Sequence, residues 1–263
     1  MKGTILDKIL DAKRERLAVL KSSAGAADIR KRALMTRSAA EPHALRRSLE
    51  KRSRINIIAE IKRASPSKGI IDADVNPAEK AREYAAGGAC GLSVLTEEDF
   101  FSGSLDDLRA ARAATSLPIL RKDFVVDEFQ IYEAAEAGAD AVLLIVAALP
   151  AESLEHLHDV AENELGLDAL VEVHDRSDLE TARGLGCRLI GVNNRSLHTF
   201  DVSLDVSREL IKFRPDKALM IAESGISSAD DIDQLSALGF DGFLVGESLM
   251  RNADPQKLLE EWV

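Results

Sequence analysis

Short runs rich in leucine and β-branched residues recur eight times from Ile55 onward, with 20 to 35 residues between successive starts. The gaps between them carry apolar residues at helical spacing, for example in 77–86, 105–114, 153–164 and 229–238. This alternation is typical of a parallel sheet, because each parallel strand needs a helical crossover to reach the next. The runs are Ile55–Ile61, Cys90–Thr96, Ile119–Phe124, Ala141–Ala147, Ala169–Val173, Leu189–Asn193, Ala218–Ala222 and Gly242–Val245.

Eight strand–helix units without a break in composition predict an α/β fold of the (β/α)8 TIM barrel type. An open doubly wound sheet more often stops at about five to seven strands. Four of the expected helices run into glycine turns, at 87–88, 138, 184–186 and 239, where glycine can adopt the left-handed conformation that ends a helix. We therefore expect one domain over residues 1–263, with a helical N-terminal extension in 1–54 and the barrel in 55–263.

The extension differs from the barrel in charge. Residues 1–54 carry 15 Lys or Arg and 6 Asp or Glu, a balance of +9, which leaves −20 for residues 55–263. A basic arm can bind nucleic acid, but this one has no aromatic side chain for base stacking, so we expect no nucleic-acid partner. An apolar stripe instead predicts a helix that packs on the acidic barrel. The stripe is Ile5, Leu6, Ile9, Leu10, Leu17 and Leu20, and we expect Lys8, Lys13, Arg14 and Arg16 to be solvated around it.

Several protein classes are disfavoured by what the sequence lacks. The longest uncharged apolar run, 141–150, is about half of the ~20 residues that a membrane-spanning helix needs, and the N-terminal residues lack the apolar core of a signal peptide. Cys90 and Cys187 are far apart and form no CxxC motif, which favours a reducing, cytoplasmic location. We find no P-loop, no dinucleotide fingerprint and no metal-binding spacing among the five histidines, so we expect no cofactor and no metal.

Charged residues stand where buried parallel strands should end in apolar ones. Glu60 and Lys62 lie two apart at the end of the first strand, and therefore on one face. In a barrel the C-terminal ends of all strands meet at one rim, where barrel enzymes place their chemistry. A single charged residue at a strand end can simply form an exposed ion pair that contributes little to stability. Charged residues at the ends of five strands instead predict an active site. The other strand ends are Arg121–Asp123, Glu172 with His174, Asn193–Arg195 and Glu223.

Two glycine turns predict a phosphate site on the same rim. Ser224-Gly225 follows the seventh strand and Gly246-Glu247 follows the eighth, which are the usual phosphate-binding positions of TIM barrels. The loop after the first strand adds Ser65 and nearby lysine and serine side chains. We expect a phosphorylated sugar derivative as the ligand.

With these residues assembled, the chain resembles the indole-3-glycerol-phosphate synthase family of tryptophan biosynthesis along essentially its whole length. The segments that carry the resemblance are 57–69 (IIAEIKRASPSKG), 93–97 (SVLTE), 101–104 (FSGS), 117–124 (LPILRKDF), 191–195 (GVNNR) and 222–226 (AESGI). The resemblance implies a cofactor-free carboxy-lyase. Its reaction closes the ring of 1-(2-carboxyphenylamino)-1-deoxyribulose 5-phosphate, and carbon dioxide and water are released as indole-3-glycerol phosphate forms. The family's N-terminal extension lies over the barrel mouth and helps to bind the substrate.

The resemblance also implies roles for the rim residues. Lys122 matches the general acid that protonates the substrate carbonyl, and we expect burial and cationic neighbours such as Lys62 to pull its pKa toward neutrality. Lys62 also matches a contact to the phosphate and the leaving hydroxyl. Glu172 and Glu60 match the carboxylates that stabilise the cationic intermediate and move protons. Either of these two carboxylates could be the base in the dehydration.

The remaining matches are to binding residues. Asn193, Arg195 and Glu223 match residues that position the substrate, and Phe101 and Leu143 match an apolar slot around its aromatic ring. The guanidinium of Arg195 suits the anthranilate carboxylate, because it is always charged and can bind in a bidentate manner. The phosphate positions are Ser65, Ser224, Gly225, Gly246 and Glu247. At Glu247 many relatives carry a small residue, so only its backbone N–H is expected to serve.

Two other interpretations remain open at this point. Phosphoribosylanthranilate isomerase is another phosphosugar barrel, but its acid and base are a cysteine and an aspartate, and Cys90 lies within a strand without a matching aspartate. A phosphate-binding barrel that has lost its activity would be expected to lack Lys122 or Glu172, and this chain has both. We expect a monofunctional, monomeric enzyme without a membrane partner and without a fused isomerase.

Overall fold

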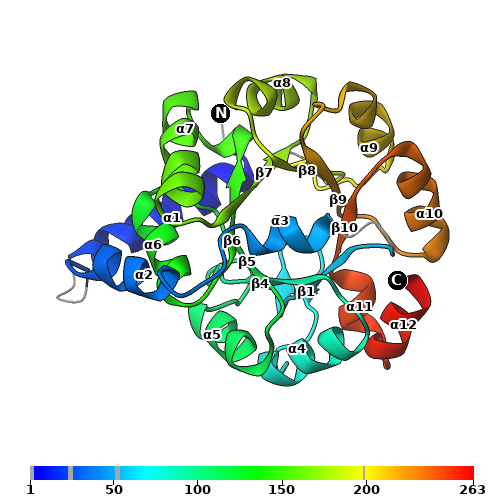
Figure 1. Cartoon of the computed structure of the whole chain (residues 1–263), viewed down its shortest axis with the longest axis horizontal. Helices are drawn as coiled ribbons and strands as arrows, with labels where there is room; N and C mark the ends of the chain where they lie inside the picture. The colour runs from blue at the N-terminus through cyan, green and yellow to red at the C-terminus, as the bar shows by residue number, and fades with distance from the viewer. Residues whose placement is uncertain (1–2, 23–25, 51–53, 198) are drawn as a thin grey trace.

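A computed structural model describes residues 3–22, 26–50, 54–197 and 199–263; Lys2, Lys51, Arg52 and His198, which the sequence analysis counts among the charged residues and histidines, lie outside these ranges. Eight parallel strands form a closed barrel in which each strand pairs with its neighbours in the chain and the last pairs with the first (Figure 1). The (β/α)8 prediction is therefore confirmed. The barrel strands are β1 (Ile57–Ile61), β4 (Gly91–Leu95), β5 (Ile119–Lys122), β6 (Ala141–Ile145), β7 (Asp168–Val173), β8 (Leu189–Asn193), β9 (Leu219–Glu223) and β10 (Gly242–Val245).

Helices follow the strands and form the outer ring. Polar N-cap side chains start several of them; for example, the Ser104 and Ser228 hydroxyls accept backbone N–H groups of the helices that follow. Gly186 and Gly239 end two helices with positive φ, as the glycine turns predict. The helices are α4 (Pro77–Ala86), α5 (Leu105–Ala114), α6 (Glu128–Glu136), α7 (Ala151–Asp159), α8 (Arg176–Leu185), α9 (Asp205–Leu210), α10 (Ala229–Leu238), α11 (Glu247–Arg251) and α12 (Pro255–Trp262).

Several short elements interrupt this regular pattern. The α7 helix continues into a π-helical turn at Val160–Glu164, so the expected helix 153–164 is present but changes its hydrogen-bonding pattern. A two-stranded antiparallel hairpin, β2 (Ala64–Ser65) with β3 (Gly69–Ile70), folds out of the loop after β1. This hairpin carries Ser65 to the barrel mouth. No helix within the described ranges is long and apolar enough to cross a membrane.

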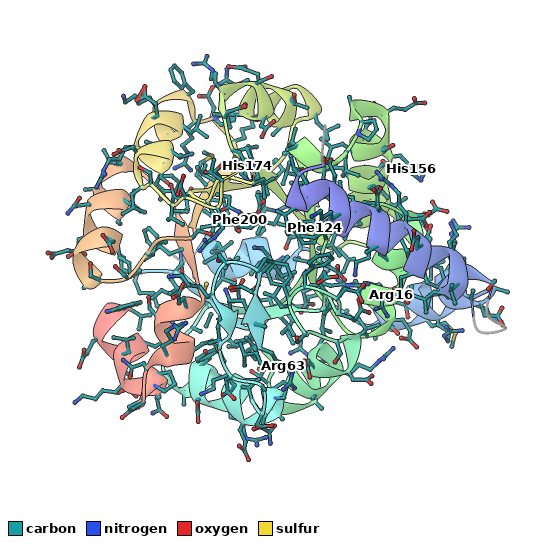
Figure 2. The ribbon with its side chains drawn as sticks, turned by 180° about the vertical axis from the view of Figure 1, so that it is seen from behind. Arg16, Arg63, Phe124, His156, His174 and Phe200 are labelled. Carbon is teal, nitrogen blue, oxygen red and sulfur yellow. The ribbon has the colours of Figure 1, made fainter. Side chains whose placement is uncertain are left out.

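The N-terminal extension runs from the mouth of the barrel to its floor. Helix α1 (Ile5–Lys21) lies across the mouth, as Figure 2 shows, and α2 (Ile29–Arg37) packs along α6. Helix α3 (Ala44–Leu49) crosses the opposite end of the strand ring (Figure 1). There Leu45 and Leu49 join the apolar cluster inside the barrel, so the extension contributes to the barrel's own core.

The apolar stripe of α1 is buried as expected at Leu6, Ile9, Leu10 and Leu17. The prediction was wrong for Leu20, which lies exposed in the last turn of the helix. The basic side chains of the extension form ion pairs with carboxylates of the barrel, which explains the charge difference between the two parts. The pairs are Lys13–Asp123, Arg16–Asp99, Lys21–Asp127, Arg30–Glu164, Arg37–Asp140 and Arg46–Glu162. The prediction that Lys13 is solvated was wrong: its side chain is 3% exposed, because it points between the mouth of the barrel and α1 toward buried carboxylates.

Candidate active site

A pocket of about 150 Å³ opens at the C-terminal ends of the strands, beneath α1. Every residue predicted for the site lines this pocket except Glu223. The rim residues of five strands and the loops after β1, β9 and β10 therefore meet in one place, as the barrel topology predicts. The predicted residues that line it are Glu60, Lys62, Ser65, Phe101, Lys122, Leu143, Glu172, Asn193, Arg195, Ser224, Gly225, Gly246 and Glu247.

Lys122 ends β5 and points into the barrel mouth, where carboxylates from other strands surround its ammonium group. Its Nζ lies 3.2 Å from Glu223 Oε2 and 3.8 Å from Glu172 Oε2. Burial opposes the charge, but Glu223, Glu172 and Glu60 raise the pKa of Lys122 above its ordinary value. The expectation of a pKa pulled toward neutrality was wrong, because the nearest charges are anionic. Lys122 is an ammonium group at neutral pH.

The three carboxylates around Lys122 differ in protonation. Burial opposes the charge of Glu172, yet His174 and Lys122 lower its pKa to about 2. Burial likewise opposes the charge of Glu60, whose pKa is lowered by Lys62 and then by Lys122. Burial raises the pKa of Glu223 to about 7, with Glu172 and Glu60 adding to the effect and Lys122 opposing it. At neutral pH Glu172 and Glu60 are therefore ionised, while Glu223 is partly protonated.

Glu223 lies beneath Lys122 instead of lining the pocket. Its side chain is 1% exposed, and it fits only because position 191 of the neighbouring strand β8 is glycine: a Cβ at Gly191 would lie 1.9 Å from Glu223 Oε1. The expected direct contact between Glu223 and substrate therefore has no support in the geometry. Its contact is with Lys122.

His174 contributes to the site through Glu172; the sequence analysis placed it at the rim but assigned it no role. Its Nε2 lies 3.3 Å from Glu172 Oε1, and its Nδ1 lies 3.7 Å from Asp178 Oδ2. Burial opposes its charge, but Asp178 and Glu172 raise the pKa of His174 to about 10. A usable signal was present, because His174 follows Glu172 by two residues and therefore shares its face. Figure 2 labels His174 together with Phe124 and Phe200 around the barrel mouth.

One side of the pocket is apolar. Phe101 and Leu143 line it as expected, and the Phe101 and Phe124 rings lie 6.1 Å apart at a tilt of 38°. Three stripe residues of α1, Ile5, Leu6 and Ile9, also line the pocket. The apolar pattern itself predicted only that these three pack on the barrel, while the resemblance implied that the extension covers the barrel mouth. Part of the stripe in fact forms a wall suited to a flat aromatic group.

The opposite side consists of hydroxyls, glycines and backbone. Ser224 and Gly225 both have positive φ, 65° and 80°, and for Ser224 this is an uncommon conformation of the kind concentrated at ligand sites. Gly246 allows Glu60 to approach, because a Cβ there would lie 2.3 Å from Glu60 Oε1. The carboxylate of Glu247 lies 3.4 Å from Lys68 Nζ and also forms an ion pair with Arg251. Both partners of this side chain are therefore cations of the protein itself.

A second cluster of ionisable residues lies at the floor of the barrel, away from the pocket. Among the described residues, His43, Glu162 and Asp168 are the group whose potential ligand atoms lie within 4.8 Å of one another. Arg46 Nη1 lies 3.3 Å from Glu162 Oε2, and Arg46 Nε lies 3.6 Å from Asp168 Oδ1. The guanidinium thus supplies the positive charge that a metal ion would supply. The cluster fastens α3 to the floor, and the absence of a metal stays a prediction.

The isomerase alternative has no support in the geometry. Cys90 is buried in the apolar cluster inside the barrel, together with Leu45 and Leu49 of α3. It does not line the pocket, so it is not placed to act as an acid on a ligand there. Cys187 is also buried.

Comparison with known proteins gives a consistent result. The family model described as indole-3-glycerol phosphate synthase matches residues 6–262. The indole-3-glycerol phosphate synthase of Carboxydothermus hydrogenoformans is 45% identical over 97% of this chain and 98% of its own length. That of Neisseria meningitidis serogroup C is 48% identical over 94% of each chain, and that of Desulfosudis oleivorans is 52% identical over 78% of each.

Solved structures share the fold at low sequence identity. The 3-hexulose-6-phosphate synthase of Salmonella typhimurium superimposes with a TM-score of 0.63 at 16% identity, covering 79% of this chain and 96% of that one. The thiamine phosphate pyrophosphorylase of Pyrococcus furiosus gives 0.59 at 19% identity, covering 83% and 95%. These likenesses support the barrel architecture alone.

Proposed function

The chain belongs to the indole-3-glycerol phosphate synthase family and is a carboxy-lyase of tryptophan biosynthesis, and from this premise we propose which of its residues carry out the reaction. The substrate, 1-(2-carboxyphenylamino)-1-deoxyribulose 5-phosphate, has an aromatic end, a ketone and a phosphate. The pocket offers an apolar side, a central lysine between carboxylates, and a side of hydroxyls and glycine turns. The order of these features supports one binding orientation, with the ketone at Lys122.

Lys122 is the general acid in this proposal. As a ring carbon of the substrate attacks the ketone carbon, the carbonyl oxygen takes a proton from the ammonium group and becomes a hydroxyl. A positioned acid of this kind contributes about 10²- to 10⁴-fold in rate. The observation that carries the proposal is the Lys122 ammonium, held among Glu223, Glu172 and Glu60 at the centre of the pocket.

Glu172 and Glu60 act on the cation that ring closure creates at the substrate nitrogen. Both carboxylates are buried, and the neighbouring cations keep both ionised, so their negative charge is already in place when the positive charge develops. Carbon dioxide then leaves from the ring carbon that attacked the ketone, and the electron pair of the broken bond restores the aromatic ring. In the last step a carboxylate removes a proton from the substrate, and the hydroxyl departs as water with a proton from an acid of the site. Lys62, which donates a hydrogen bond to Glu60, contacts the departing hydroxyl in this proposal.

The remaining residues bind the ends of the substrate. Phe101 and Leu143, with the apolar wall of α1, hold the aromatic ring, while Asn193 and Arg195 contact its carboxylate. Ser65, Ser224, Gly225, Gly246 and the backbone of Glu247 receive the phosphate, as loops of this kind do in other barrels. Glu223 positions Lys122 from below. We also propose a cytoplasmic monomer without a nucleic-acid partner, since the pocket is complete within one chain and both cysteines are free.

A direct assay tests this function. Purified protein is dialysed against EDTA and mixed with the carboxyphenylamino substrate, and formation of the indole product is followed by its absorbance and fluorescence. We expect turnover that EDTA does not change. Parallel samples receive phosphoribosylanthranilate. Turnover of that compound without any indole formation would contradict the proposal and favour an isomerase.

A further inference from the structure

Lys13 is a buried cation on α1 that reaches the barrel at the catalytic strand. Its Nζ lies 2.9 Å from Asp123 Oδ1, 3.0 Å from Glu98 Oε2 and 3.8 Å from Glu97 Oε1. Burial opposes its charge, but Asp123 and Glu98 together raise the pKa of Lys13 above its ordinary value. Asp123 and Glu97 are themselves almost fully buried. Three segments far apart in the sequence therefore meet at a single ammonium group.

Asp123 fixes the end of the strand that carries Lys122. Its Oδ2 accepts hydrogen bonds from the Thr96 hydroxyl at 2.7 Å and from Arg121 Nη2 at 3.0 Å. Its Oδ1 accepts the backbone N–H of Phe124 at 2.8 Å. Arg121 and Asp123 flank Lys122 in the chain, and their hydrogen bond to each other and the bond of Asp123 to Thr96 directly after β4 fix the backbone on both sides of Lys122.

Glu97 organises the adjacent loop in a similar way. Its Oε2 accepts the backbone N–H groups of Phe100 and Phe101 at 2.7 and 3.1 Å, and its Oε1 accepts that of Asp99 at 3.2 Å. Phe101 belongs to the apolar side of the pocket. Two of the three carboxylates that face Lys13, Asp123 and Glu97, thus hold the catalytic lysine and the wall of the aromatic slot.

The other ion pairs of α1 differ from this one. Lys21 pairs with Asp127 at 2.8 Å, but both side chains are substantially exposed, and Asp127 caps α6 instead of a pocket loop. Exposed pairs of this kind contribute little, whereas removing one partner of a buried pair leaves an uncompensated charge that shifts its surroundings. The same helix therefore provides a matched control.

We propose that Lys13 is a positioning residue for ring closure, which acts through Asp123 and Glu97 to fix Lys122 and Phe101 in place. The extension thus does more than cover the mouth: it sets the geometry of the acid and of the aromatic slot. Because a shift of about 1 Å in a reacting group can cost about 10²-fold in rate, loss of this cation lowers turnover. The inference rests on the proposed role of Lys122.

The test compares Lys13→Met with Lys21→Met, two variants that each remove one positive charge from α1. Thermal melts by circular dichroism identify a temperature at which parent and variants are folded, and kcat and KM are measured there. We expect Lys13→Met to lower kcat at least about tenfold with less than about a threefold change in KM. Lys21→Met is expected to stay within about twofold of the parent. Lys13→Gln, which keeps an amide donor near Asp123, replaces Lys13→Met if the latter does not fold.

A purely structural role predicts a different pattern. In that case the melting temperature falls, but the folded variant keeps the kcat of the parent, and this result would overturn the proposal. An equal loss of kcat in Lys21→Met would also overturn it, because the loss would then follow from removing any positive charge of α1 and not from the contacts of Lys13. Failure of the proposed function is recognised separately, since Lys122→Met would then remain active.

Discussion

At the scale of single residues, the chemistry depends on how closely carboxylates of different strands approach Lys122. The ammonium at the end of β5 faces Glu172 from β7, Glu223 from β9 and Glu60 from β1. The strand ends predict that these residues share a rim. They do not predict distances of 3.2 and 3.8 Å, which decide the direction of the pKa shift of Lys122. The distances depend on the register shift between strands around the barrel, which decides which residues of different strands lie at the same level. The sequence of a single strand does not encode this shift.

We predict that Glu172→Gln and Glu60→Gln each lower kcat more than they raise KM. The lost charge acts on a cationic intermediate, while the ground-state substrate is an anion that gains nothing from a carboxylate. Steady-state measurement of kcat and KM for the two variants distinguishes a role in stabilising the intermediate from a role in substrate binding. A change confined to KM would instead assign these residues to binding.

A second prediction concerns pH. His174, Lys122 and Asn193 all hold the pKa of Glu172 low, against the effect of burial. In His174→Asn the cation is gone, so the pKa of Glu172 rises and the carboxylate is lost at a higher pH. The acid limb of the kcat profile should therefore move to higher pH in the variant.

The matched control for this prediction is His156→Asn, which removes an exposed histidine paired with Glu128 at 2.9 Å, away from the pocket. We expect its acid limb to coincide with that of the parent. Identical profiles for His174→Asn and the parent would show that His174 does not act on Glu172.

At the scale of elements, strands and helices follow directly from the pattern of apolar residues. Helices α4, α5 and α10 begin and end at the residues that the periodicity indicates. Polar capping side chains mark the starts of all three in the sequence, and glycine turns mark the ends of α4 and α10. The β2–β3 hairpin was not predicted, because strands of two residues are too short to show a period. The role of α3 was missed for another reason: where a short helix docks is decided by tertiary packing.

The loop after β4 provides a prediction at this scale. A Cβ at Gly103 would lie 2.2 Å from the backbone oxygen of Leu95, and backbone atoms at a strand end cannot move aside cheaply. We expect Gly103→Ala to lower the free energy of unfolding by about 1–3 kcal/mol and to reduce activity, because Phe101 stands on the same loop.

Gly184→Ala on α8 is the control substitution. A Cβ at Gly184 meets no atom within 4 Å, and alanine favours helices over glycine by about 0.5–1 kcal/mol. This variant should be as stable as the parent or more stable in urea unfolding. A Gly103→Ala variant that unfolds at the same urea concentration as Gly184→Ala would contradict the account of the loop.

At the scale of the whole molecule, the extension links the two ends of the barrel. Helix α1 closes the mouth, and α3 places Leu45 and Leu49 in the inner apolar cluster at the floor. The charge difference across Arg54 predicts that the extension packs on the barrel. It does not predict that part of the extension completes the barrel's core, because charge carries no information on which end of the barrel a helix reaches.

Two truncations separate these contributions. Removal of residues 1–27 takes away α1 and leaves both leucines of α3, so we expect a cooperatively folded protein with raised KM and lowered kcat. Removal of residues 1–54 also takes away Leu45 and Leu49, which leaves a cavity inside the barrel. Large-to-small changes at one buried leucine already cost about 2–5 kcal/mol, so the longer truncation should melt far lower or not fold. Equal melting temperatures would show that the floor helix is dispensable.

The central claim, that the Lys122 ammonium is the acid for ring closure, is tested most directly by the kcat of Lys122→Ala for indole formation. The claim predicts a loss of about 10²- to 10⁴-fold in a protein that still melts cooperatively, since the side chain lies at a polar rim where its removal opens no apolar cavity. A kcat within a factor of about three of the parent, in a folded variant, would contradict it.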